Sequence, residues 1–182
     1  MASLLLSALA RMHRASTPQE FLAAHPCAWL VWEPGTWKPP LPGGGGTIPS
    51  LVVPTLPPAL GEALAFCLVA RDGQVTLGRA PECAIEINDA TLSHLHLLLM
   101  EANPGAWTVR DAGSRNGSWM DGVPLPKGQP YMLRNLARLH AGQVCLTFYG
   151  PGSLLDRLRG FRLTTQSRLQ FAANGATHVP AG

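Results

Sequence analysis

The feature that most constrains the fold of this chain is a series of short apolar or alternating runs in its central part. The first two, at residues 63–70 and 74–77, lie on either side of an Asp72-Gly73 step. An Asp-Gly step between two apolar runs predicts a β-hairpin. Many short strands separated by turn residues are typical of a β-sandwich, so we expect an all-β core. Further runs of this kind lie at residue 85 and at 95–99, 107–109, 118–120, 131–133 and 144–148.

Three polar clusters lie at the ends of these predicted strands, at residues 78–79, 93–96 and 111–117. Arginine presents a fixed fork of donors, serine a hydroxyl, and asparagine two donors and an acceptor, a combination that suits a small anion such as phosphate. No paired carboxylates, nucleophile–base pair or metal-binding cluster accompanies them in the sequence. The clusters therefore predict a site that holds a phosphate group without attacking it, and we do not expect an enzyme.

The order and spacing of these clusters resemble the forkhead-associated (FHA) domain family. Its pattern is Gly-Arg, an Asn-Asp turn, Ser-x-x-His and Asp-x-x-Ser-x-Asn-Gly, and the resemblance covers residues 62–150. It implies an all-β fold, an eleven-stranded β-sandwich, in which loops at one end bind phosphothreonine peptides. The matching residues are Gly78, Arg79, Asn88, Asp89, Ser93, His96, Asp111, Ser114, Asn116 and Gly117.

The resemblance implies a set of phosphopeptide-binding residues. Arg79 is expected to contact the phosphate, Ser93 to donate its hydroxyl, and Asn116 to bond the peptide backbone beside the phosphothreonine. Arg115 stands where the family often has threonine, and it either adds a second positive charge at the phosphate or points to solvent. Ser114 borders the pocket, and its hydroxyl fits a role in structuring the loop better than contact with the ligand. The full set is Arg79, Ser93, His94, Ser114, Arg115 and Asn116.

A second set of residues is expected to support this site. The histidine that matches His96 braces the loop after Ser93 in the family, and Gly117 permits a turn that a side chain would block. The His94-x-His96 spacing also suggests zinc, but no third ligand lies at a suitable spacing, so we expect no metal and no cofactor. The support set is Gly78, His96, Gly117 and Asp121.

The chain departs from the family pattern at two places. His94 stands where the family often has arginine, lysine or asparagine. Asn135-Leu136-Ala137 replaces a late Gly-Asp turn. Since that turn is remote from the pocket in the family, we expect the fold to be kept.

The N-terminal region, residues 1–38, predicts a helix–strand extension. A helix is expected over 3–14, followed by a second helix that starts with a capping box at Thr17 and Glu20. A strand is expected over 28–32. The tryptophans of this region can pack within the extension, against the sandwich or onto a partner, and they are Trp29, Trp32 and Trp37.

Two further regions flank the FHA-like segment. Residues 39–61 are rich in proline and glycine and predict a linker. Residues 151–182 predict a partly helical, arginine-rich tail, which carries the whole excess of the formal net charge of +3. This tail is either a solvated helix or a surface for acidic partners. Its charged residues are Arg157, Arg159, Arg162 and Arg168 against Asp156.

The cysteines are Cys27, Cys67, Cys83 and Cys145, and none forms a close pair. Because Cys67 and Cys145 lie in apolar runs, we expect them to be small buried hydrophobic residues. This usage favours a reducing cytoplasm over a secreted disulfide framework. No run approaches the ~18–20 apolar residues that span a bilayer, so we expect a soluble cytoplasmic protein.

The resemblance implies a non-catalytic adaptor, from a bacterium, that binds phosphothreonine peptides in Ser/Thr kinase signalling. The expected partner is a phosphothreonine-containing protein, either a kinase or its substrate, and no nucleic acid is expected. The alternative is a phosphate-independent assembly module on the same scaffold. Thr164 and Thr165 in the tail also suggest phosphorylation and binding in cis.

Overall fold

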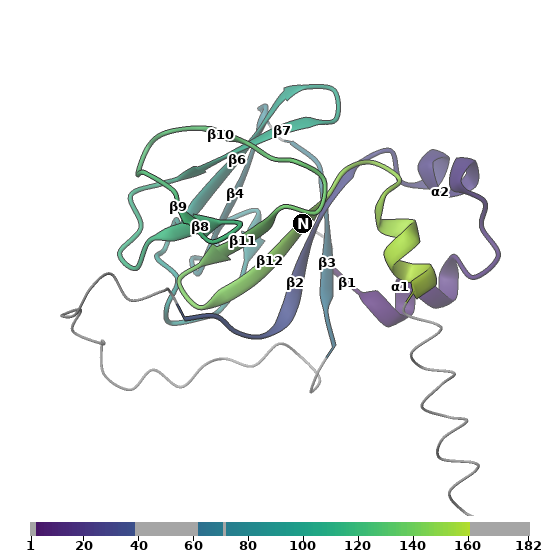
Figure 1. The fold of residues 1–182 in the computed structure, drawn as a ribbon, viewed down its shortest axis with the longest axis horizontal. Helices are drawn as coiled ribbons and strands as arrows, with labels where there is room; N and C mark the ends of the chain where they lie inside the picture. The colour runs from purple at the N-terminus through teal and green to yellow at the C-terminus, as the bar shows by residue number, and fades with distance from the viewer. Residues whose placement is uncertain (1–2, 39–61, 71, 161–182) are drawn as a thin grey trace, which may run out of the picture.

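The chain folds into two facing β-sheets with helices on one side (Figure 1). The computed structural model describes residues 3–38, 62–70 and 72–160. Within these residues there are twelve strands, where the resemblance implied eleven. The prediction of an all-β sandwich is confirmed. The predicted linker, and the part of the tail that contains Thr164 and Thr165, lie outside the described residues.

The larger sheet has seven strands, and every neighbouring pair in it is antiparallel. The strand that follows the N-terminal helices lies inside this sheet, between two strands from the FHA-like segment. The predicted extension therefore supplies strands to the sandwich. In spatial order the strands are β1 (Ser3–Leu5), β3 (Leu64–Leu68), β2 (Ala28–Thr36), β12 (Val144–Tyr149), β11 (Arg138–Ala141), β8 (Ser118–Met120) and β9 (Val123–Pro124).

The smaller sheet has five strands, of which β4 and β5 are parallel. The predicted hairpin at Asp72-Gly73 is wrong, because β3 and β4 lie in different sheets. Asp72 and Gly73 do have the positive φ angles of a turn, 53° and 76°. This turn carries the chain from one sheet to the other, and β3 and β4 both bury apolar side chains in the core between the sheets. In spatial order the strands are β10 (Tyr131–Met132), β7 (Ala106–Asp111), β6 (Leu97–Asn103), β4 (Gln74–Gly78) and β5 (Ile85–Glu86).

A second apolar core lies on the outer face of the seven-stranded sheet. The helices α1 (Leu6–Met12) and α2 (Pro18–Ala24), together with a helix over residues 154–160, cover this face (Figure 1). Side chains alternate along a strand, and this divides the tryptophans of β2 between the two cores. Trp32 is buried in the sandwich core and Trp29 in the helical core.

The N-terminal helices agree in part with the sequence. The predicted helix over 3–14 is wrong at its start, because residues 3–5 pair with β3 and the helix begins at Leu6. The capping box is confirmed: the Thr17 hydroxyl oxygen accepts a hydrogen bond from the Glu20 amide, and the Thr17 amide donates to the Glu20 carboxylate at 2.8 Å. Local sequence decides a cap, whereas pairing with a distant strand decides residues 3–5.

The helix over 154–160 is tied to the sheet by polar contacts. The Arg157 guanidinium donates to the Glu33 carboxylate at 2.7 Å and to the Tyr149 hydroxyl at 3.1 Å. Arg159 donates to the Ser16 carbonyl oxygen at 3.4 Å. This part of the arginine-rich tail is therefore docked on the fold. Among the described residues, no helix is both long enough and apolar enough to cross a membrane.

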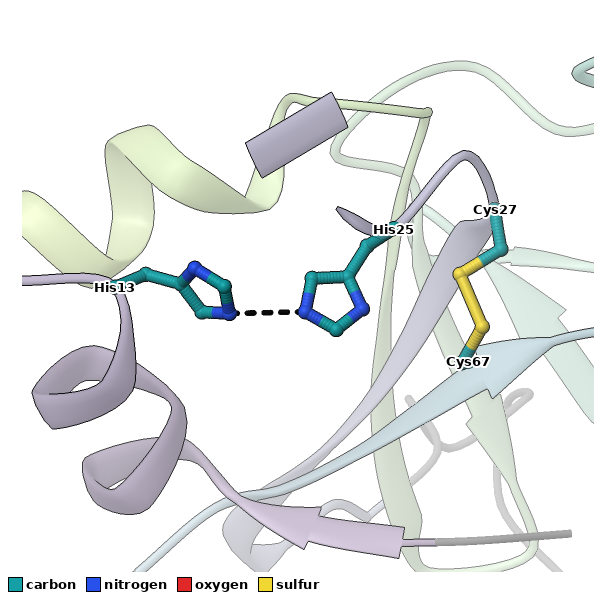
Figure 2. The surroundings of a disulfide bond; sticks show 4 residues. All are labelled: His13, His25, Cys27 and Cys67. Atoms are coloured by element: carbon teal, nitrogen blue, oxygen red, sulfur yellow. Dashed lines mark hydrogen bonds between the residues drawn. A yellow bond between two sulfur atoms is a disulfide. The ribbon is translucent and has the colours of Figure 1, made fainter. Parts of the chain in front are cut away.

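Cys27 and Cys67 form a disulfide, which corrects the expectation that Cys67 is an unpaired buried residue (Figure 2). The two cysteines are 40 residues apart in sequence, but the pairing of Ala28 with Leu68 brings them together, with a Cα–Cα distance of 6.1 Å. Sequence spacing does not reveal such a pair. Disulfides are rare in cytosolic proteins, so the cysteines give no support for a reducing compartment.

A pair of histidines lies beside the disulfide (Figure 2). The Nε2 atoms of His13 and His25 are 2.9 Å apart, within hydrogen-bonding distance. His13 follows α1 and His25 follows α2, so this contact joins the ends of the two helices.

The turn that replaces the family's Gly-Asp step contains a strained residue. Leu136 has a φ of 67° and is 57% exposed. The Ala137 amide donates to the Arg134 carbonyl oxygen at 3.0 Å, which closes the turn. The Asn135 side chain accepts hydrogen bonds from the Gly150 amide and the Ser153 hydroxyl. The turn therefore forms without the family's Gly-Asp step, but Leu136 has to adopt a left-handed backbone conformation.

We expect Leu136→Gly to raise the free energy of unfolding by about 0.5–1 kcal/mol, because glycine adopts positive φ without the clash of a Cβ atom. Urea unfolding followed by circular dichroism measures the change. Arg134→Gly, in the same exposed turn, is the matched control and should lower stability. If Leu136→Gly is no more stable than the wild-type protein, Leu136 is not strained.

We expect the double variant Cys27→Ser/Cys67→Ser to lose about 2–4 kcal/mol of unfolding free energy, because the bond restricts a long loop in the unfolded chain. Reduction of the wild-type protein should produce a similar loss. Cys83 and Cys145 are unpaired, so Cys145→Ser should remain sensitive to reductant. Indifference of the wild-type protein to reductant would refute a stabilising disulfide.

Candidate functional site

The predicted polar clusters meet at one end of the sandwich, in the loops that follow β4, precede β6 and join β7 to β8. The Arg79 amide donates to the Ser93 carbonyl oxygen at 3.0 Å. The Arg115 amide donates to the Ser93 hydroxyl oxygen at 2.9 Å. Ser93 therefore joins the other two clusters. Within the described part of the chain its hydroxyl hydrogen has no acceptor, so it can be donated to a ligand.

Gly78 permits the close approach of two of these loops. A Cβ atom at this position would lie 2.0 Å from the His94 carbonyl oxygen, which no side chain tolerates. The Ala80 amide and the Cys83 thiol both donate to the same carbonyl oxygen, at 3.1 Å each. The segment after β4 is thus held against Ser93 and His94, and this contact positions Arg79.

His96 connects Ser93 to the loop after β7. Its Nδ1 accepts a hydrogen bond from the Ser93 amide at 3.1 Å, so its Nε2 carries the hydrogen and donates to the Gly117 carbonyl oxygen, also at 3.1 Å. The side chain is fully buried. Burial lowers the pKa of His96, because the charged form loses its hydration. Both ring nitrogens are engaged, which leaves neither for a metal ion.

Asp111 organises the loop between β7 and β8. Its carboxylate accepts hydrogen bonds from the amides of Gly113 and Ser114, at 2.8 and 2.7 Å, and from the hydroxyls of Ser114 and Ser118. Burial acts to raise the pKa of Asp111, but these hydrogen bonds outweigh it and lower the pKa below the usual value. The carboxylate stays ionised and holds the loop in one conformation.

Ser114 belongs to the interior of this loop. It is fully buried, it donates to Asp111 at 2.6 Å, and its oxygen accepts from the Gly117 amide at 3.0 Å. These contacts occupy the hydroxyl. We therefore place Ser114 among the supporting residues rather than against the ligand.

Asn116 is fixed by a residue that the sequence analysis did not select. Its Nδ2 donates to the Thr91 carbonyl oxygen at 2.7 Å. The Thr91 hydroxyl oxygen in turn accepts from the Gln143 amide at 3.0 Å, and the Gly142 amide donates to the Gly117 carbonyl oxygen at 3.1 Å. The carboxamide oxygen of Asn116 accepts no hydrogen bond from the described residues, so it can bond a peptide.

No sequence signal points to Thr91 or Gly142. A Cβ atom on Gly142 would lie 2.6 Å from the Thr91 carbonyl oxygen. Packing therefore requires glycine at this position of the turn between β11 and β12. Only the folded chain brings these two residues together.

Three side chains of the predicted binding set are available to a ligand. Arg79, His94 and Arg115 are all exposed. In the part of the chain that the structure describes, neither Arg79 nor Arg115 forms an ion pair. Exposed guanidinium groups without a carboxylate partner have the chemistry to bind an anion.

Asp121 has a supporting role away from the positive side chains. It has a φ of 51° and Gly122 one of 83°, which makes a tight two-residue connection between β8 and β9. The Asp121 carboxylate accepts from the Arg138 amide at 2.9 Å and so anchors this hairpin to β11.

Residues 75–142 match the family model of the FHA domain. This match covers less than half of the chain, and it identifies this segment as an FHA domain. The match begins in β4 and ends before β12, so the N-terminal strands, β12 and the helical layer lie outside it. FHA domains are phosphopeptide-binding modules that generally lack catalytic activity. A comparison with curated proteins gave no match.

Several solved structures are similar to the chain at low identity. The MEK1 FHA domain is 19% identical with a TM-score of 0.45, over 71% of this chain and 93% of that one. The FHA domain of CT664 from Chlamydia trachomatis is 15% identical with a TM-score of 0.44, over 67% and 96%. The N-terminal FHA domain of S. cerevisiae Rad53p, solved with a phosphothreonine peptide, is 19% identical with a TM-score of 0.44, over 50% and 88%. The family assignment rests on the family-model match.

We expect the unfolding free energy to fall as the pH drops below 6.5, the ordinary pKa of histidine. The pKa of folded His96 is lower than this, so the unfolded chain binds more protons in this range, and each such group contributes a slope of up to about 1.4 kcal/mol per pH unit. Urea unfolding at neutral and mildly acidic pH measures the slope.

His25 and His140 also have lowered pKa values, because burial disfavours their charged forms, so they contribute to the same slope. His96→Gln should flatten the slope, and so should His25→Gln as a comparison outside the site. A His96→Gln variant with the slope of the wild-type protein would show that His96 does not titrate as described.

Proposed function

We propose that the FHA domain of this chain binds phosphothreonine peptides, and that the protein is a non-catalytic adaptor in Ser/Thr kinase signalling. The observation that carries the proposal is the arrangement of Arg79, Ser93, Arg115 and Asn116. They lie on loops that hydrogen bonds hold together, and the arginines have no competing carboxylate among the described residues.

The chemistry of the ligand suits this arrangement. Phosphothreonine carries about −1.5 to −2 charges near neutral pH and three strong acceptor oxygens. Arg79 provides a forked donor with full positive charge, and the Ser93 hydroxyl provides a second donor. The Arg115 amide donates to the Ser93 hydroxyl oxygen, and its exposed side chain can add a second positive charge at the phosphate. Because the loops are fixed before binding, little ordering is required when the ligand arrives.

Asn116 gives the site its selectivity for a peptide over free phosphate. One of its Nδ2 hydrogens bonds the Thr91 carbonyl oxygen, which orients the carboxamide. The remaining hydrogen and the oxygen can bond an amide and a carbonyl of a peptide backbone. We infer that the partner is a protein with a phosphothreonine in an exposed, extended segment, either a kinase or one of its substrates.

The alternative function, phosphate-independent assembly, is favoured by an exposed apolar surface on the five-stranded sheet. Met100 is 42% exposed and Met132 is 55% exposed. Both pair with Thr108, so they flank it on the face away from the core. A partner that stays bound after phosphatase treatment and after Arg79→Ala would support this alternative.

The location of the protein is a separate part of the proposal. Kinase signalling places the chain in the cytoplasm, whereas the Cys27–Cys67 disulfide is typical of an oxidising compartment. Thiol labelling in intact cells decides between them. Labelled Cys27 and Cys67 would support the cytoplasm, and protected cysteines would contradict it.

We expect Arg79→Ala to weaken binding of a phosphothreonine peptide by about 10- to 100-fold, the loss typical of one or more charge-assisted hydrogen bonds. Isothermal titration calorimetry measures it, with the phosphoserine and unphosphorylated forms of the same peptide. Arg134→Ala is the matched control, since this exposed arginine lies in the turn before β11, apart from the site. Equal affinity for all three peptides would refute the proposed function.

A further inference from the structure

An aromatic group lies on the outer face of the seven-stranded sheet, and neither apolar core contains it. Trp37 follows β2, and its ring stacks on His140 with centroids 4.2 Å apart and planes 12° apart. The same ring tilts over Trp119, at 4.6 Å and 55°. Pro124 pairs with Trp119 on the adjacent strand. We call these residues the aromatic shelf: Trp37, Trp119, Pro124 and His140.

Core packing does not account for this group. Trp37 and Trp119 belong to neither of the two cores of the described residues, although they are among the largest apolar side chains of the chain. Both stay partly exposed, and Pro124 is exposed. Along β8 the neighbours Ser118 and Met120 point to the sandwich core, which leaves Trp119 on the opposite face.

The shelf is continuous with the phosphopeptide loops. A Cβ atom on Gly117 would lie 3.1 Å from the Trp119 ring, so this ring packs directly against the residue that follows Asn116. The Trp37 amide donates to the Gln143 carbonyl oxygen at 3.0 Å, and the Gln143 amide donates to Thr91, the residue that orients Asn116. A peptide held at Asn116 therefore has the shelf beside it.

The chemistry of the shelf indicates what it contacts. Tryptophans that are partly exposed in a free protein often become buried at the centre of an interface when a partner binds. They offer a large apolar area at a small cost in side-chain entropy. Among the shelf residues only His140 can carry charge. Burial lowers its pKa, so it is neutral near neutral pH. The surface suits an aliphatic or proline side chain.

We propose that the aromatic shelf is a second contact site for the phosphorylated partner, which binds an apolar side chain flanking the phosphothreonine. This inference rests on the proposed function, and it assigns sequence selectivity to Trp37, a residue outside the family match. The occupant is a segment of the partner polypeptide, since the shelf adjoins the loops that hold the phosphopeptide.

The test uses the full chain and synthetic peptides with phosphothreonine among small polar residues. Leucine or proline replaces one flanking position at a time. We expect the best replacement to strengthen binding about tenfold, which corresponds to burial of one apolar side chain. Trp37→Ala should abolish this gain and leave the affinity for the unsubstituted phosphopeptide unchanged. Trp37→Phe should retain most of the gain, and Met132→Ala on the other sheet all of it.

A direct measurement accompanies the variants, in case Trp37→Ala perturbs the fold. In ¹H–¹⁵N spectra of the wild-type protein, the indole signals of Trp37 and Trp119 should shift on addition of the apolar peptide and stay in place with the unsubstituted phosphopeptide. Static indole signals with both peptides would overturn the proposal.

The outcomes separate this inference from the proposed function. If the unsubstituted phosphopeptide binds through Arg79 but no apolar replacement strengthens it, the shelf proposal fails and the proposed function stands. If no phosphopeptide binds in preference to its unphosphorylated form, both fail. A dimer in solution that Trp37→Ala dissociates, together with no apolar preference, would assign the shelf to a second copy of the chain.

Discussion

The hydrogen bonds of His96 hold together the two loops on which the proposed phosphate site depends. One ring nitrogen accepts from the Ser93 amide and the other donates to the Gly117 carbonyl oxygen, so a single buried ring sets the separation between Ser93 and Asn116. Asp111 performs the equivalent task within the second loop, where it gathers the amides and hydroxyls around Ser114. Without this buried network the loops that carry Arg79 and Arg115 would have no fixed position relative to each other.

The structure surrounds this network with elements from outside the FHA match. β2 enters the seven-stranded sheet between β3 and β12, and the helices cover the outer face with a core of their own. The disulfide at Cys27 and the contact between Arg157 and Glu33 tie this layer down. The N-terminal segment thus has two effects: it is tied to the sandwich at one end, and at the other it brings Trp37 beside the loops of the candidate site.

Much of the site and part of the fold could be predicted from the sequence. The polar clusters were found because their residue types and spacing are local properties, and they do meet at one end of the sandwich. The capping box at Thr17 was found for the same reason. The hairpin at Asp72-Gly73 was predicted wrongly, because a turn residue specifies the bend but not which sheet the next strand joins. The disulfide was missed because strand pairing alone brings Cys27 to Cys67.

By itself, the sequence determined the chemistry of the candidate loops, the need for glycine at Gly117 and the apolar runs that become strands. Tertiary structure alone decided that Thr91 orients Asn116 and that Trp37 stacks on His140 next to Trp119. The physical reason is range. Turn preference and alternation act over a few residues, whereas these contacts join residues far apart in the chain, and they form only when the two sheets and the helical layer pack together.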